Sequence, residues 1–140
     1  LFKALIILSK LNIRPSIVLT LSVNDYKKLK IDQLKKKYNL NIFNYHSLNR
    51  MKFIKIFSSA RALVYPSLNE SFGLPLMEAK NLKLDIITSN LSFAQNYANP
   101  NYTFSINDNF SLIFCIYRYL HDNNLINNDN FSLLNIKDIL

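Results

Sequence analysis

The 140-residue chain has one glycine, one cysteine, two histidines, two glutamates and no tryptophan. Its single cysteine, Cys115, cannot form an intrachain disulfide, which excludes a disulfide-stabilised secreted scaffold and favours a reducing compartment. The histidines, His46 and His121, lie too far apart along the chain to form a local zinc motif. One glycine is too few for the phosphate-binding loops of nicotinamide-dependent dehydrogenases, and no P-loop sequence is present.

Long uncharged apolar runs are also missing. The most apolar stretch, residues 1–23, is interrupted by Lys3, Lys10 and Arg14, so it falls short of the roughly 18 residues that a membrane-spanning helix needs. Residues 4–8 have the apolar character of a signal-peptide core, but no small-residue cleavage site follows them. We therefore expect no transmembrane segment.

The residues that are present indicate one folded domain with a basic surface. The chain is 49% hydrophobic with ten Phe and eight Tyr, which suffices for a packed core in a domain of this length. Seventeen Lys and Arg stand against nine Asp and Glu, giving a net charge of +8. This charge favours anionic partners such as nucleotides, phospholipid headgroups or nucleic acid, without choosing among them.

Predicted strands and helices alternate along the chain. Short runs rich in Val and Ile predict strands, and apolar residues at helical spacing predict helices between them. The expected strands are 16–21, 41–45, 62–65, 84–88 and 102–106, and the expected helices are 2–11, 25–38, 50–60, 74–82, 93–98 and 110–123. This order predicts an α/β fold with a parallel sheet and helices on both faces.

The ends of the chain lead to two further expectations. A doubly wound domain normally opens on a strand, whereas this chain opens on a helix, so we expect the first strand to be missing. We expect residues 1–126 to form the domain, truncated at its N-terminus, and residues 127–140 to form a helical tail that packs on it.

The predicted helix 25–38 carries most of the basic residues. Its lysines are Lys27, Lys28, Lys30, Lys35, Lys36 and Lys37. A solvated face of an amphipathic helix explains such a run most simply, and an anionic membrane surface is the next explanation. Nucleic acid is the weakest, because the cluster contains no Arg and no nucleic-acid-binding module surrounds it.

The two glutamates and the glycine lie within nine residues, directly after the predicted strand 62–65. Pro75 suits the first turn of a helix, whose free backbone amides attract phosphate. Gly73 lets the backbone approach a ligand or adopt positive φ. Glu70 and Glu78 would flank this helix start, and a carboxylate can accept hydrogen bonds from neighbouring sugar hydroxyls. The pattern fits a sugar-nucleotide site, although a solvated helix glutamate, a glutamate that complements the helix dipole and a turn glycine would give the same sequence.

Residues 62–79, with Tyr-Pro-Ser, Glu-Ser-Phe-Gly-Leu-Pro and Met-Glu-Ala, closely resemble the Glu-x7-Glu signature of the family 4 (group 1) retaining glycosyltransferases of the GT-B fold. Weaker agreement extends over most of residues 16–122. The resemblance implies the C-terminal, Rossmann-like half of a GT-B enzyme, which binds the nucleotide sugar.

The resemblance also implies roles for individual residues. Glu70 would be the catalytic residue, contacting donor hexose hydroxyls near the reacting centre, and Glu78 would hydrogen-bond the ribose. Four residues would meet the sugar and diphosphate: Ser71, Phe72, Gly73 and Leu74. Tyr45 and His46 would lie beside the nucleobase, although His46 could equally be an ordinary loop histidine. No cofactor and no metal are implied.

We therefore expect a donor-binding fragment of a retaining glycosyltransferase. It would transfer sugar from a nucleotide diphosphate sugar to a surface-glycan or lipid-linked acceptor held by a missing N-terminal domain. The expected location is cytoplasmic, with peripheral attachment to the inner face of the membrane suggested by the charge. The family's diphosphate-clamping Arg and Lys pair and its usual glycines near Asn44 and before Asp85 are absent. A non-catalytic nucleotide-sugar-binding or interaction module is therefore the alternative, and activity of this chain alone is uncertain.

Overall fold

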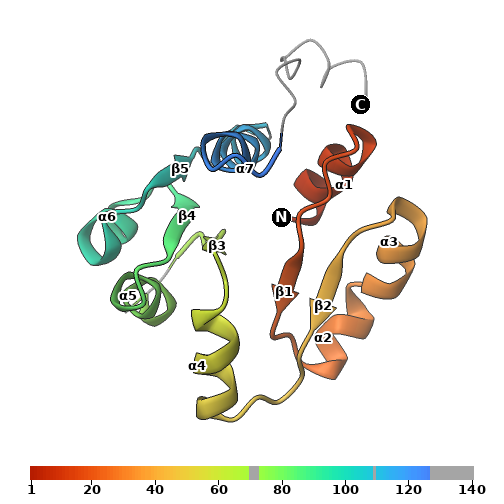
Figure 1. Cartoon of the computed structure of the whole chain (residues 1–140), viewed down its shortest axis with the longest axis horizontal. Helices are drawn as coiled ribbons and strands as arrows, with labels where there is room; N and C mark the ends of the chain where they lie inside the picture. Colours follow the sequence, from red (N-terminus) through yellow and green to blue (C-terminus); the bar gives the residue numbers. More distant parts are fainter. Residues whose placement is uncertain (70–72, 109, 127–140) are drawn as a thin grey trace. The chain divides into compact units, whose positions relative to one another are not determined.

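Helices and strands alternate along the part of the chain that the structure describes. The structure is a computed structural model that describes residues 1–69, 73–108 and 110–126 (Figure 1). The helices are α1 (Phe2–Lys10), α2 (Val23–Lys28), α3 (Ile31–Tyr38), α4 (Arg50–Ser58), α5 (Leu74–Asn81), α6 (Ser92–Ala98) and α7 (Ser111–Asp122). The strands are β1 (Ile17–Leu19), β2 (Ile42–Asn44), β3 (Ala62–Tyr65), β4 (Asp85–Ser89) and β5 (Tyr102–Phe104). Every strand pairing is parallel, so the predicted α/β fold with parallel strands is confirmed.

The described residues form two compact units. The first unit comprises Leu1–Arg50 with Ile126, and the second comprises Met51–Leu125. The predicted boundary at residue 126 between domain and tail stays a prediction, because residues 127–140 lie outside the described part of the chain.

In the first unit, β1 and β2 form a two-stranded parallel sheet with Ile17 opposite Ile42. Side chains of α1, α2 and α3 pack against one face of this sheet around a buried cluster of Leu5, Ile31, Leu40 and Ile42. Because side chains alternate along a strand, the intervening residues point to the other face. There the paired residues Val18 and Phe43 are 47% and 50% exposed. This sheet is therefore covered on one face only by its own unit.

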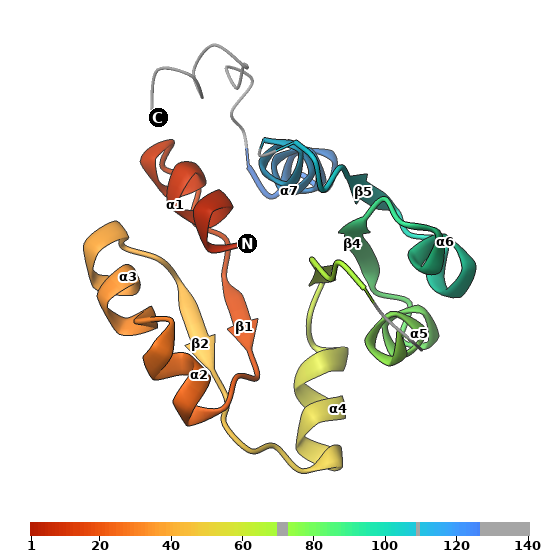
Figure 2. The same cartoon turned by 180° about the vertical axis from the view of Figure 1, so that it is seen from behind.

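In the second unit, three parallel strands lie in the order β3-β4-β5. Helices α5 and α6 lie on one side of this sheet and α7 on the other (Figures 1 and 2). The first side is closed by Leu76 and Ala79 of α5, Ile86 of β4 and Ala94 and Ala98 of α6, all buried. On the other side, α7 packs along β5 and buries Ile113, Ile116 and Leu120. Helices on both faces are what a buried parallel sheet requires.

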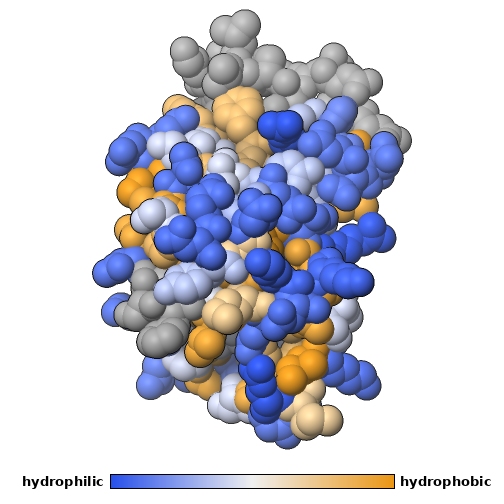
Figure 3. All heavy atoms as spheres, turned by 90° about the vertical axis from the view of Figure 1, so that its left-hand side faces the viewer, coloured by the Kyte–Doolittle hydropathy of each residue, from blue (hydrophilic) through white to orange (hydrophobic). Residues whose placement is uncertain are grey.

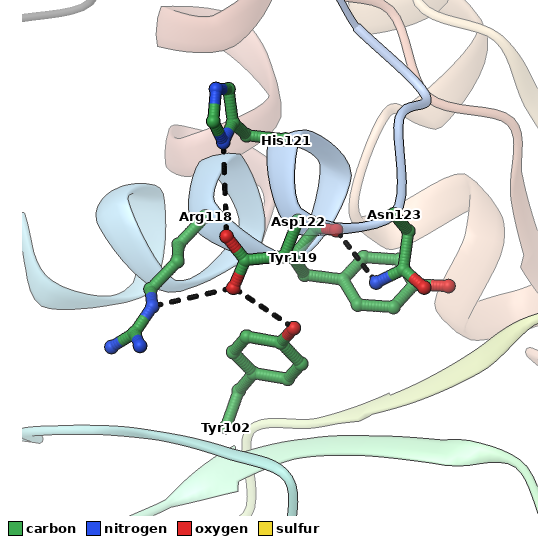
Figure 4. Close-up of polar contacts among 6 residues, drawn as sticks. All are labelled: Tyr102, Arg118, Tyr119, His121, Asp122 and Asn123. Carbon is green, nitrogen blue, oxygen red and sulfur yellow. Dashed lines mark hydrogen bonds and ion pairs between the residues drawn. The ribbon is translucent and has the colours of Figure 1, made fainter.

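A polar cluster fastens the end of α7 to β5 (Figure 4). The Tyr102 hydroxyl donates to the Asp122 carboxylate over 3.1 Å, and the same carboxylate faces Arg118 Nε at 3.4 Å and His121 Nδ1 at 3.7 Å. The Tyr102 ring also meets Tyr119 edge-on, with 5.6 Å between the ring centroids. Burial, followed by the bond to Asp122, raises the pKa of Tyr102. The role of this cluster is structural.

The predicted continuous helix 25–38 is wrong. Helix α2 begins at Val23, capped by the Ser22 hydroxyl, which accepts a bond from the Asp25 amide, and it ends before Lys30, whose backbone is left-handed at φ 51°. A second helix, α3, then starts at Ile31. The break allows Ile31 to be fully buried while Leu29 remains 43% exposed. Burial of Ile31 thus outweighs the continuous helical spacing that the sequence suggests.

Asparagine takes over a role that glycine usually has in ending helices. Four of the seven non-glycine residues with positive φ in the described part of the chain are asparagines: Asn12, Asn39, Asn99 and Asn124. They lie at or just after the ends of α1, α3, α6 and α7. Among non-glycine residues, asparagine tolerates this conformation best, which explains how one glycine suffices.

Candidate functional site

The loop after β3 is held in place by hydroxyl groups at the carboxyl end of β4. Thr88 Oγ1 donates to the Tyr65 carbonyl over 2.9 Å, and Ser89 Oγ donates to the Ser67 carbonyl over 2.7 Å. Both hydroxyl-bearing residues are fully buried. Neither was predicted from the sequence, although two hydroxyl residues directly after the apolar pair Ile86 and Ile87 were the available signal. They fix the direction in which the chain leaves β3.

Gly73 precedes α5 in a conformation that suits glycine. Its backbone is left-handed, with φ 54° and ψ 36°, and its carbonyl accepts the amides of Leu76 and Met77 at 2.9 and 3.2 Å. A Cβ atom added at this position would lie 3.1 Å from Cδ2 of Tyr97 in α6. Both the backbone angle and the packed ring therefore favour glycine here, whether or not a ligand binds.

The start of α5 carries the chemical feature that the sequence predicts. Pro75 occupies the first turn, so that turn loses one amide donor, and the Leu74 amide lies ahead of the intrahelical hydrogen bonds. The Leu74 side chain is 62% exposed, which leaves this end of the helix at the surface. A helix start of this kind, beyond the carboxyl end of a parallel strand, is a place where anions bind in α/β proteins.

Glu78 lies on the second turn of α5. Its neighbours Leu76 and Ala79 are fully buried against β3, β4 and α6, and Glu78 itself is half-buried. The carboxylate therefore comes from the same rigid helix as Leu74, one turn further on. The other predicted residues of this segment, Glu70, Ser71 and Phe72, lie outside the described residues.

Tyr45 and His46 belong to the first unit and follow β2. The Asn44 side chain bridges the backbone of Leu21, accepting its amide at 2.9 Å and donating to its carbonyl at 3.1 Å. His46 Nδ1 lies 2.8 Å from Asn44 Nδ2 and 2.9 Å from the Leu21 carbonyl oxygen, and its ring meets Tyr26 edge-on. His46 is exposed, and Nδ1 makes one of these two hydrogen bonds, accepting from Asn44 in one tautomer or donating to the Leu21 carbonyl in the other. Asn44 is a positioning residue that sequence reasoning missed.

Cys115 and His121 do not form a catalytic pair. Cys115 is buried in the core beneath α7, and burial raises the pKa of its thiol to about 11, so the thiol is protonated at neutral pH. His121 instead stacks on Tyr117 and faces Asp122. Within residues 1–69, 73–108 and 110–126, no three His, Cys, Asp or Glu side chains come together as a metal-binding group.

The outer face of the second unit is mainly hydrophilic. In the view of Figure 3, which faces the α5 and α6 side of this unit, hydrophilic side chains predominate and hydrophobic ones are scattered between them. This face offers no continuous apolar patch among the described residues.

Comparison with known proteins identifies the family of the chain. A search of curated proteins finds no match. The sequence pattern of the family described as "Glycosyl transferases group 1" matches residues 2–125, which is nearly all of the described chain. The matched region contains the strand, the Gly73 turn and the helix that carries Glu78. The chain therefore belongs to the group 1 glycosyl transferases.

Proposed function

We propose that this chain binds the donor, a nucleotide diphosphate sugar, in a retaining glycosyltransferase. The observation that carries the proposal is the start of α5 beyond the carboxyl end of β3, where the buried Gly73 has a left-handed backbone, Pro75 lies in the first turn and the Leu74 side chain is exposed. The family supplies the reaction class, glycosyl transfer. The nature of the donor rests on the chemistry of this helix start together with the half-buried Glu78.

Each proposed contact follows from the chemistry of the group involved. The diphosphate would accept a hydrogen bond from the Leu74 amide and gain from the positive end of the α5 dipole. The Glu78 carboxylate would accept hydrogen bonds from the two ribose hydroxyls. The diphosphate leaves during transfer, so a helix start that stabilises its growing negative charge would also lower the reaction barrier.

The remaining roles are proposed on the resemblance alone. Glu70 would contact the donor hexose as the catalytic residue, and Ser71 and Phe72 would line the sugar and diphosphate. Tyr45 and His46 would lie beside the nucleobase. We propose no metal and no cofactor for this site.

We further propose a surface glycan or its lipid-linked precursor as the acceptor, with the anomeric configuration retained on transfer. The alternative is that the chain binds the nucleotide sugar without transferring it. Incubation with radiolabelled donor and a lipid-linked glycan acceptor distinguishes the two, because a transferase produces labelled glycan. A module that only binds would show donor affinity and no product.

The ribose contact is tested by Glu78→Gln, measured by isothermal titration calorimetry with uridine and guanosine diphosphate sugars. We expect at least tenfold weaker binding, since hydrogen bonds to a charged acceptor contribute about 1.5–3 kcal/mol. The melting temperature should stay nearly constant, because the change leaves side-chain size unaltered.

The matched control is Asp108→Asn, which removes one negative charge from the same unit. Asp108 accepts the Phe110 amide near the start of α7, and Asn retains such an acceptor. This variant should bind the donor like the unmodified chain. Equal affinities of Glu78→Gln and the unmodified chain would show that the ribose role is wrong.

A further inference from the structure

The positive charge of this chain is concentrated in the first unit. Residues 1–50 contain ten Lys and Arg and two acidic residues, whereas residues 51–125 contain six Lys and Arg and five acidic residues. Residues 1–50 therefore carry nearly all the excess of positive charge, and residues 51–125, which hold the proposed diphosphate and ribose contacts, are nearly neutral. A surface role of the first unit would account for this imbalance.

The excess is concentrated on α2 and α3, which follow one another beside β2 (Figures 1 and 2). We define the lysine surface as Lys27, Lys28, Lys30, Lys35, Lys36 and Lys37. All but the half-buried Lys35 are exposed. Within the described part of the chain, none of the six makes an ion pair.

Hydroxyl groups, not lysines, engage the two acidic residues of the first unit. Asp25 accepts the Ser22 hydroxyl over 2.6 Å, and Asp32 accepts the Tyr26 hydroxyl over 2.6 Å. Both bonds hold local structure, the first at the cap of α2 and the second across the break between the helices. Both carboxylates keep their charge in these bonds and offset two of the six lysines, which leaves residues 23–38 with a net charge of +4.

Two apolar side chains are exposed among these lysines. Val23 in the first turn of α2 is 47% exposed, and Leu29 at the break between the helices is 43% exposed. Leu29 lies between Lys28 and Lys30, and the left-handed Lys30 leaves it outside the core that receives Ile31. Exposed apolar side chains flanked by cations suit a boundary between charged headgroups and hydrocarbon.

We propose that the lysine surface docks the chain on an anionic lipid bilayer, with Leu29 entering the headgroup region. Clusters of four to eight lysines on a helix bind anionic headgroups through their charge, without geometric specificity. Nucleic acid fits less well, because base and phosphate recognition favours Arg and stacking aromatics. The cluster has no Arg, and its aromatic neighbours Tyr26 and Tyr38 pack against the core.

The proposed attachment is peripheral. In residues 1–69, 73–108 and 110–126, no helix has the length and apolar character to cross a bilayer. Charge and the single exposed leucine at the helix break would therefore supply the affinity. Such binding weakens as salt rises, because salt screens surface charges.

The test is flotation of the full chain with vesicles of phosphatidylglycerol and phosphatidylcholine, compared with pure phosphatidylcholine. We expect flotation with the anionic vesicles only, lost at high salt. A variant that neutralises four exposed lysines, Lys27→Gln, Lys28→Gln, Lys30→Gln and Lys36→Gln, should bind at least tenfold more weakly. Leu29→Ser, which leaves the charge unchanged, should bind a few-fold more weakly.

The matched control neutralises four exposed lysines of the second unit: Lys52, Lys55, Lys80 and Lys83, each to Gln. Both variants lose the same charge, so equal effects would mean that net charge alone drives binding and would overturn the proposal. Absence of flotation by the unmodified chain, or lysine-dependent binding to duplex DNA instead of vesicles, would also overturn it. If the quadruple variant fails to fold, Leu29→Ser and the salt dependence decide. Donor affinity should be unchanged in the lysine-surface and Leu29→Ser variants, which separates this proposal from the donor site.

Discussion

The two units of this chain differ in how they use their surfaces. The second unit covers both faces of a three-stranded parallel sheet and holds the Gly73 turn and Glu78 on a helix buried against that sheet. The first unit covers one face of a two-stranded sheet and carries the excess positive charge. The proposed diphosphate and ribose contacts lie in the second unit, and the proposed membrane contact lies in the first. Each unit can therefore be perturbed alone.

The largest effect should come from the core of the second unit. Leu76 of α5 is fully buried against β4 and α6. Leu76→Ala should destabilise this unit by about 2–5 kcal/mol through lost burial and a cavity. Hydrogen exchange resolved by segment would show faster exchange in β3–β5 and unchanged exchange in β1 and β2. Equal acceleration in both sheets would contradict independent units.

A smaller but still clear loss should follow Gly73→Val. The new Cβ would meet the Tyr97 ring at 3.1 Å, and a β-branched residue is strained at φ 54°. We expect a loss of about 1–3 kcal/mol in unfolding free energy by urea titration, since the left-handed backbone costs about 1–2 kcal/mol and the contact with the Tyr97 ring adds to it. The control is Asn99→Ala, which places an alanine at positive φ in an exposed position. It should cost less unfolding free energy than Gly73→Val.

Each unit contains a group whose raised pKa makes the stability of that unit fall at alkaline pH. Burial raises the pKa of Cys115 in the second unit to about 11 from 9.0, so the unfolded thiol ionises first and stability falls as pH rises from about 9 to about 11. In the first unit, the hydrogen bond to Asp32 raises the pKa of Tyr26 from 10.0 to about 12, so the stability of this unit falls between about pH 10 and about pH 12. Urea titrations of Cys115→Ala and Tyr26→Phe should each lose one of these slopes. If Cys115→Ala leaves the slope between pH 9 and 10 in place, below the range in which Tyr102 and Tyr119 contribute, the burial argument fails.

The smallest expected effect is a gain in the stability of the second unit. Lys83 follows α5 with a left-handed backbone at φ 57°. Lys83→Gly should relieve left-handed strain and stabilise the second unit by about 0.5–1 kcal/mol after the entropy cost of glycine. Thermal unfolding measures this gain, with Lys80→Gly, inside α5, as a control that should destabilise. A loss at Lys83→Gly would show that its side chain supports the turn.

Sequence alone predicts the order and type of nearly all elements, because apolar spacing and the short Val- and Ile-rich runs reflect burial directly. It misses the break at Lys30. The helical spacing of apolar residues from Tyr26 to Tyr38 is continuous and does not reveal that Ile31 is buried in the core. The sequence predicts Gly73 and Glu78 as site residues through their rarity and spacing, and these roles stay predictions. It misses Thr88, Ser89 and Asn44, because their roles are hydrogen bonds to backbone more than twenty residues away, which no local pattern contains.

The central claim is that the start of α5 receives the phosphates of a nucleotide sugar and Glu78 its ribose. The most direct test is a titration of the isotope-labelled chain with uridine and guanosine diphosphate sugars, followed by amide chemical shifts. We predict that the largest shifts occur at Gly73, Leu74 and the first two turns of α5 and that Glu78→Gln diminishes them. Saturable shifts confined to other segments, or none at millimolar donor, would contradict the claim.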